Sequence, residues 1–423
     1  MSTPPALGID PFSTELRFFG PDTDGWKEVK PQMPPGTDDQ EEEKRLAGAK
    51  AAREELRNLL LSSLQMQHLI VLAGSGTSLG PIAKGPSMGT LWYECVLARP
   101  GSQEENLEAP TKAERVIKTV GYDICVEGES IERLLSRCEA YVQVKPCPEV
   151  FSFITESKNV ILNKCSSFLD PSDPAQLEAH RTFLHRLSRR RVRDSRLKVF
   201  TTNYDLCFET AAGKQGLVVL DGFSFSQPRQ FDPRFFLYDI VRRPTSGEEI
   251  GTPLEGVFHL YKLHGSVNWS RKGDTEIEVD PNPTGEAACL IYPAKGKYQQ
   301  SYVQPHVELV SQYFSVLREP NTCLIVAGFG FNDDHLSEPI LSAVRTNPHL
   351  RLIIVDPSAS GITAQNPVSN KYWDRLFSLA KQGEDVWLIN ATFADFADMI
   401  PDLKSLTPAQ RLTRDIKLIA GTQ

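Results

Sequence analysis

The chain has 423 residues and lacks any run of apolar residues near the roughly 18 that a membrane-spanning helix needs. Residues 1–15 also lack the basic-then-apolar layout of a signal peptide, so we expect a cytoplasmic protein that does not engage a membrane. The eight cysteines are scattered, and no two are spaced CxxC. That spacing argues against a zinc ribbon and a thioredoxin-type redox pair, and we expect no bound metal.

Basic residues are also fewer than acidic residues. The 46 Lys and Arg residues face 54 Asp and Glu residues, which gives a net charge of -8. This balance disfavours nucleic acid as the main ligand. A basic cluster at residues 186–198 stands out locally, and its default interpretation is a solvated helix face or a protein interface. Hydrophobic residues at 40% and charged residues at 24% are typical of a folded globular protein, which excludes a disordered chain and a coiled-coil rod.

Composition divides the chain into regions. Residues 1–45 are punctuated by prolines and contain an acidic run, which predicts an N-terminal arm or linker. Residues 46–400 form the expected catalytic domain, in which residues 80–195 read as a helical insertion. Residues 401–423 are expected to form a C-terminal helical tail.

Short apolar runs without polar alternation recur along the domain, as expected for strands buried on both faces of a parallel sheet. They lie at residues 68–73, 197–202, 217–220, 257–263, 288–292, 322–329, 350–355 and 385–389. Helical patterns at 307–317 and 336–346 lie between some of them. The alternation predicts an α/β fold with a Rossmann-like, doubly wound parallel sheet.

A glycine-rich turn, Gly74-Ser75-Gly76-Thr77-Ser78, follows the first buried run. Glycines in such a turn let the backbone approach a pyrophosphate, while amide and hydroxyl groups supply donors. The pattern is neither GxGxxG nor the P-loop motif. An ordinary tight strand-to-helix turn remains an equal alternative.

Two further motifs follow apolar runs. The first contains Thr202, Asn203 and Asp205, whose polar groups would face the crevice at the carboxyl end of a strand, although an Asx turn is the alternative for this motif. The second contains His264, a side chain suited to proton transfer near neutral pH. A lone His is more often structural, but Gly265 after it permits close approach of a substrate.

The last motifs lie near the end of the domain. Gly328 and Gly330 end a strand, and the acidic residues with a His that follow at 333–335 suggest either a metal site or, more simply, an acidic helix N-terminus. Asp356 ends the next strand, where an acidic residue commonly binds an adenosine ribose hydroxyl or simply forms a turn.

The order of these motifs resembles the sirtuin family. The resemblance implies phosphate binding by Gly74, Ser75, Gly76, Thr77 and Ser78, and nicotinamide-ribose contacts by Thr202, Asn203 and Asp205. It further implies that His264 is the base and that Gly328, Gly330 and Asp356 serve the adenosine half of NAD, which would be the substrate. The chain departs from protein-deacylating sirtuins because it has no CxxC pairs after His264.

The phrases TTNYDLCFETAA, LYKLHGSVNW and AGFGFNDDHL look more closely like the sirtuin-like subunit of bacterial anti-phage systems that is paired with a HerA-type hexameric ATPase. That branch implies an NAD hydrolase that depletes cellular NAD in abortive infection, and a homo-oligomer that docks onto the ATPase. A zinc-free protein deacylase or ADP-ribosyltransferase, and a non-catalytic NAD-sensing scaffold, are the competing interpretations. The stoichiometry, the trigger and the direction of control by the ATPase stay open.

Overall fold

A computed structural model describes residues 16–21, 23, 25–30, 39–98, 110–191, 193–243, 251–273, 276–285, 287–292, 303–362 and 371–402. Its largest unit is a nine-stranded sheet with the order β2-β1-β14-β13-β12-β3-β4-β8-β5. The strands of this sheet are β1 (Arg17–Phe19), β2 (Lys27–Glu28), β3 (His68–Ala73), β4 (Leu197–Thr201), β5 (Val218–Leu220), β8 (Val257–Lys262), β12 (Thr322–Ala327), β13 (Leu350–Val355) and β14 (Val386–Asn390). The smaller strands are β6 (Val241–Arg242), β7 (Thr252–Pro253), β9 (Gly265–Lys272), β10 (Glu276–Val279) and β11 (Ala288–Leu290).

The centre of the sheet, from β14 to β5, is parallel throughout. Both faces of these strands are covered, which explains the apolar runs without polar alternation. In β3, for example, Leu69 and Val71 contribute to the core on one face, while Ile70 and Leu72 contribute to the core on the other. The predicted doubly wound α/β sheet is therefore confirmed.

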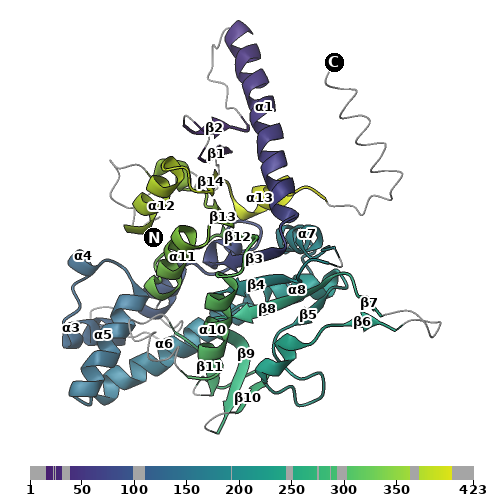
Figure 1. The fold of residues 1–423 in the computed structure, drawn as a ribbon. Coiled ribbons are helices and arrows are strands. Elements are labelled where there is room, and N and C mark those ends of the chain that lie inside the picture. The colour runs from purple at the N-terminus through teal and green to yellow at the C-terminus, as the bar shows by residue number, and fades with distance from the viewer. Residues whose placement is uncertain are drawn as a thin grey trace, which may run out of the picture.

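Helices form a layer on each face of the sheet (Figure 1). One layer contains α1 (Asp39–Leu64), α7 (Glu178–Leu187), α8 (Cys207–Lys214) and α13 (Phe393–Met399). The other contains α10 (His306–Val316), α11 (Asp334–Thr346) and α12 (Lys371–Lys381). None of the described helices is long and apolar enough to cross a membrane.

The helical insertion is smaller than residues 80–195. Its helices are α2 (Met88–Trp92), the π-helical turn η2 (Tyr93–Leu97), α3 (Lys112–Val120), α4 (Ile124–Glu127), α5 (Ile131–Val144) and α6 (Pro148–Ser167). Apart from α4, they share a separate core that also includes Val267, Leu290 and Tyr292 from the segments after β8. The helix α7 was predicted to belong to the insertion, but it packs on α8 and α13 beside the sheet, because its apolar face joins the main core.

Part of the expected N-terminal arm belongs to the sheet. The strand β1 pairs antiparallel with β14, and β2 pairs with β1, so this segment extends the sheet at one edge. The expected boundary at residue 45 falls inside α1, whose N-terminal half projects from the body of the molecule in Figure 1. Residues 403–423, which were expected to form the helical tail, lie outside the described residues.

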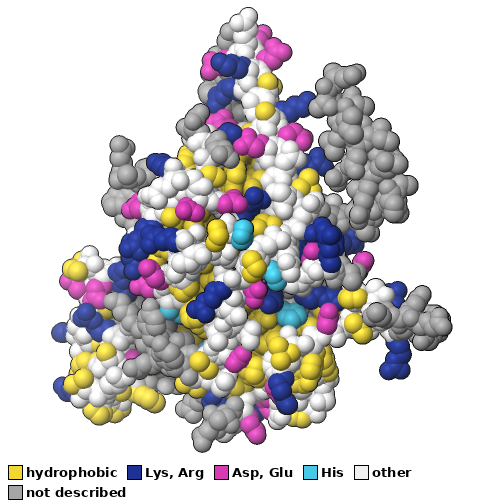
Figure 2. All heavy atoms as spheres, in the orientation of Figure 1, with side chains coloured by type: hydrophobic (Ala, Val, Ile, Leu, Met, Phe, Trp, Pro, Cys, Tyr) yellow, Lys and Arg dark blue, Asp and Glu magenta, His cyan; other side chains and the backbone are white. Residues whose placement is uncertain are grey.

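The basic cluster at 186–198 binds within the chain itself. Arg186 donates to the carbonyl oxygens of Ala397, Asp398 and Ile400, at the end of α13. Arg190 donates to carbonyl oxygens that follow α1, among them that of Gln67. Cations at helix C-termini are favourable because they satisfy the last carbonyl groups. The face drawn in Figure 2 shows positive and negative side chains interspersed, without an extended basic surface.

His180 is a buried histidine in the core between α7 and α13. Its ring lies against Phe208 and Phe393, with centroid distances of 5.1 and 5.0 Å. Both ring nitrogens are buried without a hydrogen-bond partner among the described residues. Burial therefore lowers the pKa of His180 from 6.5 to about 4, since the charged imidazolium would lose its hydration.

This lowered pKa predicts acid sensitivity that one substitution should reduce. Below pH 6.5 the unfolded chain binds a proton at this position, whereas the folded chain does not until about pH 4. Between pH 7 and pH 4, the unmodified chain should therefore lose about 3 kcal/mol of unfolding free energy that the variant His180→Phe does not lose. Urea denaturation at several pH values measures it. Parallel stability curves for the two proteins would contradict this assignment.

Candidate active site

The carboxyl ends of the central strands lie in one register. Ala73 of β3 is paired with Ala327 of β12 and with Thr201 of β4. Val355 of β13 is paired with Ala327, and Lys262 of β8 with Thr201. Five of the motifs singled out in the sequence begin within two residues of these strand ends, namely those of Gly74, Thr202, His264, Gly328 and Asp356. The fold therefore brings all of them to the same edge of the sheet, where doubly wound proteins bind their ligands.

The glycine turns after β3 and β12 pack directly against each other. The Gly76 amide donates to the Gly328 carbonyl oxygen at 2.9 Å. A Cβ atom at Gly74 would lie 2.5 Å from that same oxygen, and a Cβ atom at Gly76 would lie 2.6 Å from the Gly328 Cα atom. Gly328 itself has a φ of 60°, a left-handed conformation that favours glycine. These glycines are thus required for the two backbones to touch each other.

Asn203 joins the second motif to the first. Its side-chain Nδ2 donates to the Gly74 carbonyl oxygen at 3.0 Å, and to the hydroxyl oxygens of Thr77 and Ser78, each at 3.1 Å. The residue is buried. The structure therefore assembles the predicted Asn203 and the predicted phosphate turn into one hydrogen-bonded unit, held from a neighbouring strand.

Hydrogen bonds within the first turn occupy several of the groups that were predicted to bind phosphate. The amides of Thr77 and Ser78 donate to carbonyl oxygens of the same turn, which is the short 3₁₀ helix η1 (Ser75–Thr77). The side chains of Thr77 and Ser78 are also buried beside Asn203, whereas Ser75 is exposed. Of the three predicted hydroxyl groups, Ser75 is the one at the surface.

Asp205 and His264 have structural contacts of their own. Asp205 accepts a hydrogen bond from the Cys207 amide at 3.0 Å, the Asx turn weighed as the alternative for this motif. His264 is buried, and its ring stacks on that of His335 with a centroid distance of 5.9 Å. The room beside Gly265, expected to admit a substrate, is occupied by the backbone of Cys289, because a Cβ atom there would lie 2.0 Å from the Cys289 carbonyl oxygen.

The remaining predicted residues lie at the same edge of the sheet, after the strands β12 and β13. Asp356 follows β13, accepts from the Ser358 amide at 2.8 Å, and has its pKa raised by burial. The Gly328 amide donates to the Val355 carbonyl oxygen, so Asp356 and Gly328 leave neighbouring strands together. Gly330 is exposed beyond them.

The acidic residues before α11 act at the helix N-terminus. Asp333 is its N-cap residue, and Asp334 accepts from the Tyr372 hydroxyl at 2.7 Å and pairs with Lys371 at 3.2 Å. These contacts favour the interpretation as an acidic helix N-terminus over a metal site. Within the described part of the chain, no group of three His, Cys, Asp or Glu side chains is placed to hold a metal ion.

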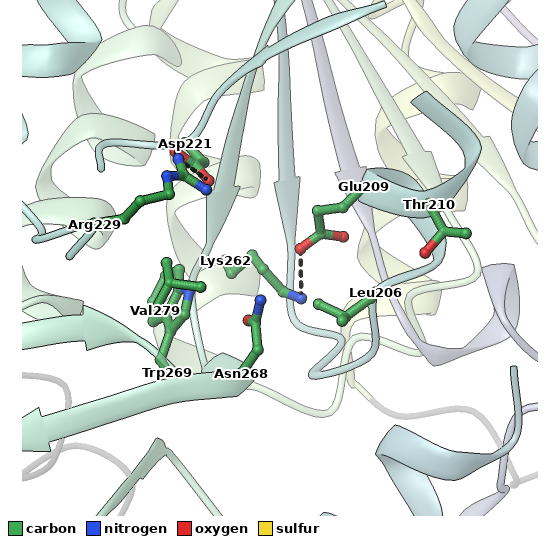
Figure 3. A pocket seen from close by; sticks show the side chains of 9 residues that line it. All are labelled: Leu206, Glu209, Thr210, Asp221, Arg229, Lys262, Asn268, Trp269 and Val279. Atoms are coloured by element: carbon green, nitrogen blue, oxygen red, sulfur yellow. Dashed lines mark hydrogen bonds and ion pairs between the residues drawn. The ribbon is translucent and has the colours of Figure 1, made fainter. Parts of the chain in front are cut away.

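Lys262, which the motif analysis passed over, has a central position at this edge. It is the last residue of β8, and its side chain is 2% exposed. Its ammonium pairs with Glu209 at 2.9 Å (Figure 3). It also donates to the Ser266 hydroxyl at 2.7 Å. The signal was a lone Lys within an apolar run, because a charge at a buried strand position requires specific partners.

A pocket of about 260 Å³ opens beside this ion pair. Figure 3 shows a second ion pair across it, in which Arg229 donates to Asp221 at 2.7 Å. Burial raises the pKa of Glu209 and that of Asp221, although Lys262 and Arg229 oppose the rise.

Comparison with known proteins supports a sirtuin-like family. Residues 197–377 match the SIR2-like domain, a span that includes the Asn203, His264 and Gly328 motifs. Among solved structures, the chain is similar to a variant of a Sir2 homologue in complex with ADP-ribose, with 14% identity over 81% of this chain and 94% of that chain and a TM-score of 0.37. A structure described as "Structural Basis for the Mechanism and Regulation of Sir2 Enzymes" shares 12% identity over 82% and 95% of the two chains, with a TM-score of 0.35. No curated protein matches the chain.

The contact between the two glycine turns predicts a large effect of one methyl group. Gly76→Ala should lower the free energy of unfolding by about 1–3 kcal/mol, because the new Cβ atom would meet backbone that has no room to move. Gly213→Ala is the matched control, since a Cβ atom on this exposed position of α8 meets nothing within 4 Å. It should stabilise the helix by about 0.5–1 kcal/mol. Equal unfolding curves for the two variants would refute the packing.

Proposed function

We propose that the chain is an NAD glycohydrolase, which cleaves the bond between nicotinamide and ribose and releases nicotinamide and ADP-ribose. One observation carries this proposal: Asn203, held by Gly74, Thr77 and Ser78, leaves the sheet beside the turn that bears His264. The SIR2-like match of residues 197–377 supports an NAD-dependent activity of the sirtuin type.

The reaction needs little acid catalysis from the protein. Nicotinamide leaves as a neutral molecule, because the electron pair of the broken C–N bond neutralises the pyridinium nitrogen. The ribose carbon passes through an oxocarbenium-like transition state, as in other glycosyl transfers. A water oxygen then bonds to that carbon, and the water gives up one proton.

We assign each step to a residue at this edge. Asn203, whose nitrogen is fixed by the first turn, would present its amide oxygen to the attacking water or the ribose. His264 would accept the proton of the water, directly or by way of a ribose hydroxyl. Asp205, held by the Cys207 amide, would orient the ribose and stabilise the developing positive charge.

Incubation of the purified chain with NAD, in the absence of a protein substrate, distinguishes the candidate activities. The hydrolase yields free nicotinamide and ADP-ribose. A zinc-free deacylase yields O-acyl-ADP-ribose only when an acyl peptide is added, and an ADP-ribosyltransferase yields a modified acceptor. NAD that stays intact while it binds would indicate a sensor and would contradict the proposal.

Substitution of Asn203 should affect both chemistry and folding. Asn203→Asp keeps the shape but loses the Nδ2 donor, so the turn after β3 loses three hydrogen bonds. NAD cleavage should fall by about a hundredfold or more, and the free energy of unfolding by about 1–3 kcal/mol. Asn282→Ala, at an exposed position between β10 and β11, is the control and should change neither. A cleavage rate at half the unmodified value would remove Asn203 from the mechanism.

His264→Ala tests whether His264 transfers the proton. It should slow cleavage by about a hundred- to ten-thousandfold if His264 is the general base. NAD cleavage is measured by nicotinamide release under saturating NAD. An unchanged rate in a folded variant would assign proton transfer to another group.

We further propose that the chain is the NAD-depleting effector of a bacterial anti-phage system, forming a homo-oligomer that docks onto a HerA-type ATPase. The support is the sequence resemblance of the TTNYDLCFETAA and LYKLHGSVNW phrases. The internal bonds of Arg186 and Arg190 argue against the basic cluster as the main docking surface. The projecting half of α1, acidic in its first turn, is a better candidate.

Two measurements test the assembly together: the mass of the chain in light scattering, and its NAD cleavage rate with and without the ATPase. An oligomer whose rate changes with the ATPase is expected, because a partner shifts activity only if it binds the active and inactive states differently. A strict monomer whose rate ignores saturating ATPase would contradict the proposal.

A further inference from the structure

Lys262 contacts the backbone of the turn that carries Asn203. Its ammonium donates to the Tyr204 carbonyl oxygen at 3.1 Å and also to the Asp205 carbonyl oxygen. Both carbonyl groups lie within two residues of Asn203. A strand residue that ends β8 thus holds the turn that follows β4.

The same ammonium also reaches the segment that follows His264. It donates to the Ser266 hydroxyl at 2.7 Å, and Ser266 donates in turn to the Asn268 side-chain oxygen at 2.7 Å. Ser266 is fully buried. One side chain therefore links the Asn203 turn to the His264 turn, the two segments to which the proposed reaction is assigned.

A buried ammonium is a costly choice at this position. Its neighbours Leu260 and Leu263 are apolar and buried, and an apolar side chain would complete the strand without loss of hydration. The cost is offset only because Glu209 and the carbonyl oxygens of Tyr204 and Asp205 together surround the charge. These contacts place the ammonium where it holds the backbone of the Asn203 turn. The strand β8 by itself does not require a charge at this position.

We propose that Lys262 is a positioning residue, which holds the Asn203 and His264 turns in the mutual arrangement that NAD cleavage requires. This inference rests on the proposed NAD hydrolysis. Lys262 acts through the two turns and does not itself touch NAD. Its loss should lower kcat while KM for NAD changes little, because the binding surfaces stay but the reacting groups lose their alignment.

The substitutions distinguish two sets of Lys262 contacts. One is its hydrogen bonds to the turn carbonyl oxygens, which we call the clamp, and the other is its ion pair with Glu209. Lys262→Met removes the ammonium but leaves the partly buried Glu209 without its cation, so it lowers both stability and kcat. The double variant Lys262→Met, Glu209→Gln removes both charges, which restores much of the stability while kcat stays at least about tenfold low. Glu209→Gln alone removes the anionic partner and so lowers the stability, but it leaves the ammonium on the turn carbonyl oxygens and should keep kcat within about twofold of the unmodified chain.

Arg229→Met is the matched control for the pocket. Arg229 lines the same pocket, but its side-chain hydrogen bonds within the described part of the chain go to Asp221 and to the Ser224 carbonyl oxygen, away from the Asn203 turn. It should keep kcat within the same limits. A loss of kcat in Arg229→Met equal to that in the double variant would show that any disturbance of the pocket slows cleavage, and would overturn the specific role of Lys262.

The pocket also allows a rescue experiment, because Lys262 lines it. In Lys262→Ala, added propylammonium should enter the vacated space and raise kcat several-fold, whereas neutral propanol should not. A merely structural role predicts equal effects of the two additives on kcat, or none.

Hydrogen exchange gives a readout that needs no activity. In the double variant, the amides of residues 202–207 should exchange faster than in Glu209→Gln, since the turn loses its clamp. If the unmodified chain does not cleave NAD, the proposed hydrolysis fails, and faster exchange still supports the clamp. If the unmodified chain cleaves NAD and the double variant matches it in kcat and in exchange, the inference about Lys262 is wrong and the hydrolysis stands.

Discussion

The common register of the central parallel strands is the constraint on which the rest of the site depends. Ala73, Thr201, Lys262, Ala327 and Val355 end their strands in one row. Segments from distant parts of the chain can meet only because the strands stop together. The glycine turns then close the centre of this row, since the backbone of Gly76 lies directly on that of Gly328.

Buried polar groups add a second level of order to this edge. Asn203 and Lys262 are both buried, and each donates hydrogen bonds to backbone and side-chain oxygens of neighbouring segments. Such networks are costly when a partner is missing, so they specify one arrangement of the turns. The insertion helices pack from outside against Val267 and Leu290, in the segments that follow His264, and so support the same arrangement.

The sequence was informative where a single physical rule applied. Apolar runs without alternation predicted the parallel sheet, because strands covered on both faces leave no polar side. The placement of Asn203 just beyond a strand end was also predicted, whereas its hydrogen bonds to the glycine turn came from the structure. The extent of the insertion did not follow, since the amphipathic pattern of α7 is the same whether it packs on the sheet or on other helices.

Other features needed three dimensions because their partners are remote in sequence. At Gly76 and Gly265 the missing side chain was expected to leave space for a ligand. In the structure, backbone atoms of Gly328 and Cys289 fill that space. Nothing local in the sequence identifies such neighbours. Lys262 was overlooked for the same reason, because its four partners come from the turn after β4, from α8 and from β9.

The central claim is that this edge of the sheet binds the ADP-ribose portion of NAD beside Asn203. A crystal structure of the chain with ADP-ribose tests it most directly. The account predicts the pyrophosphate at the turn of Ser75 and Gly76, with the nicotinamide-side ribose at Asn203 and the adenosine near Asp356. Well-defined ADP-ribose at another surface, with this edge left empty, would contradict the account.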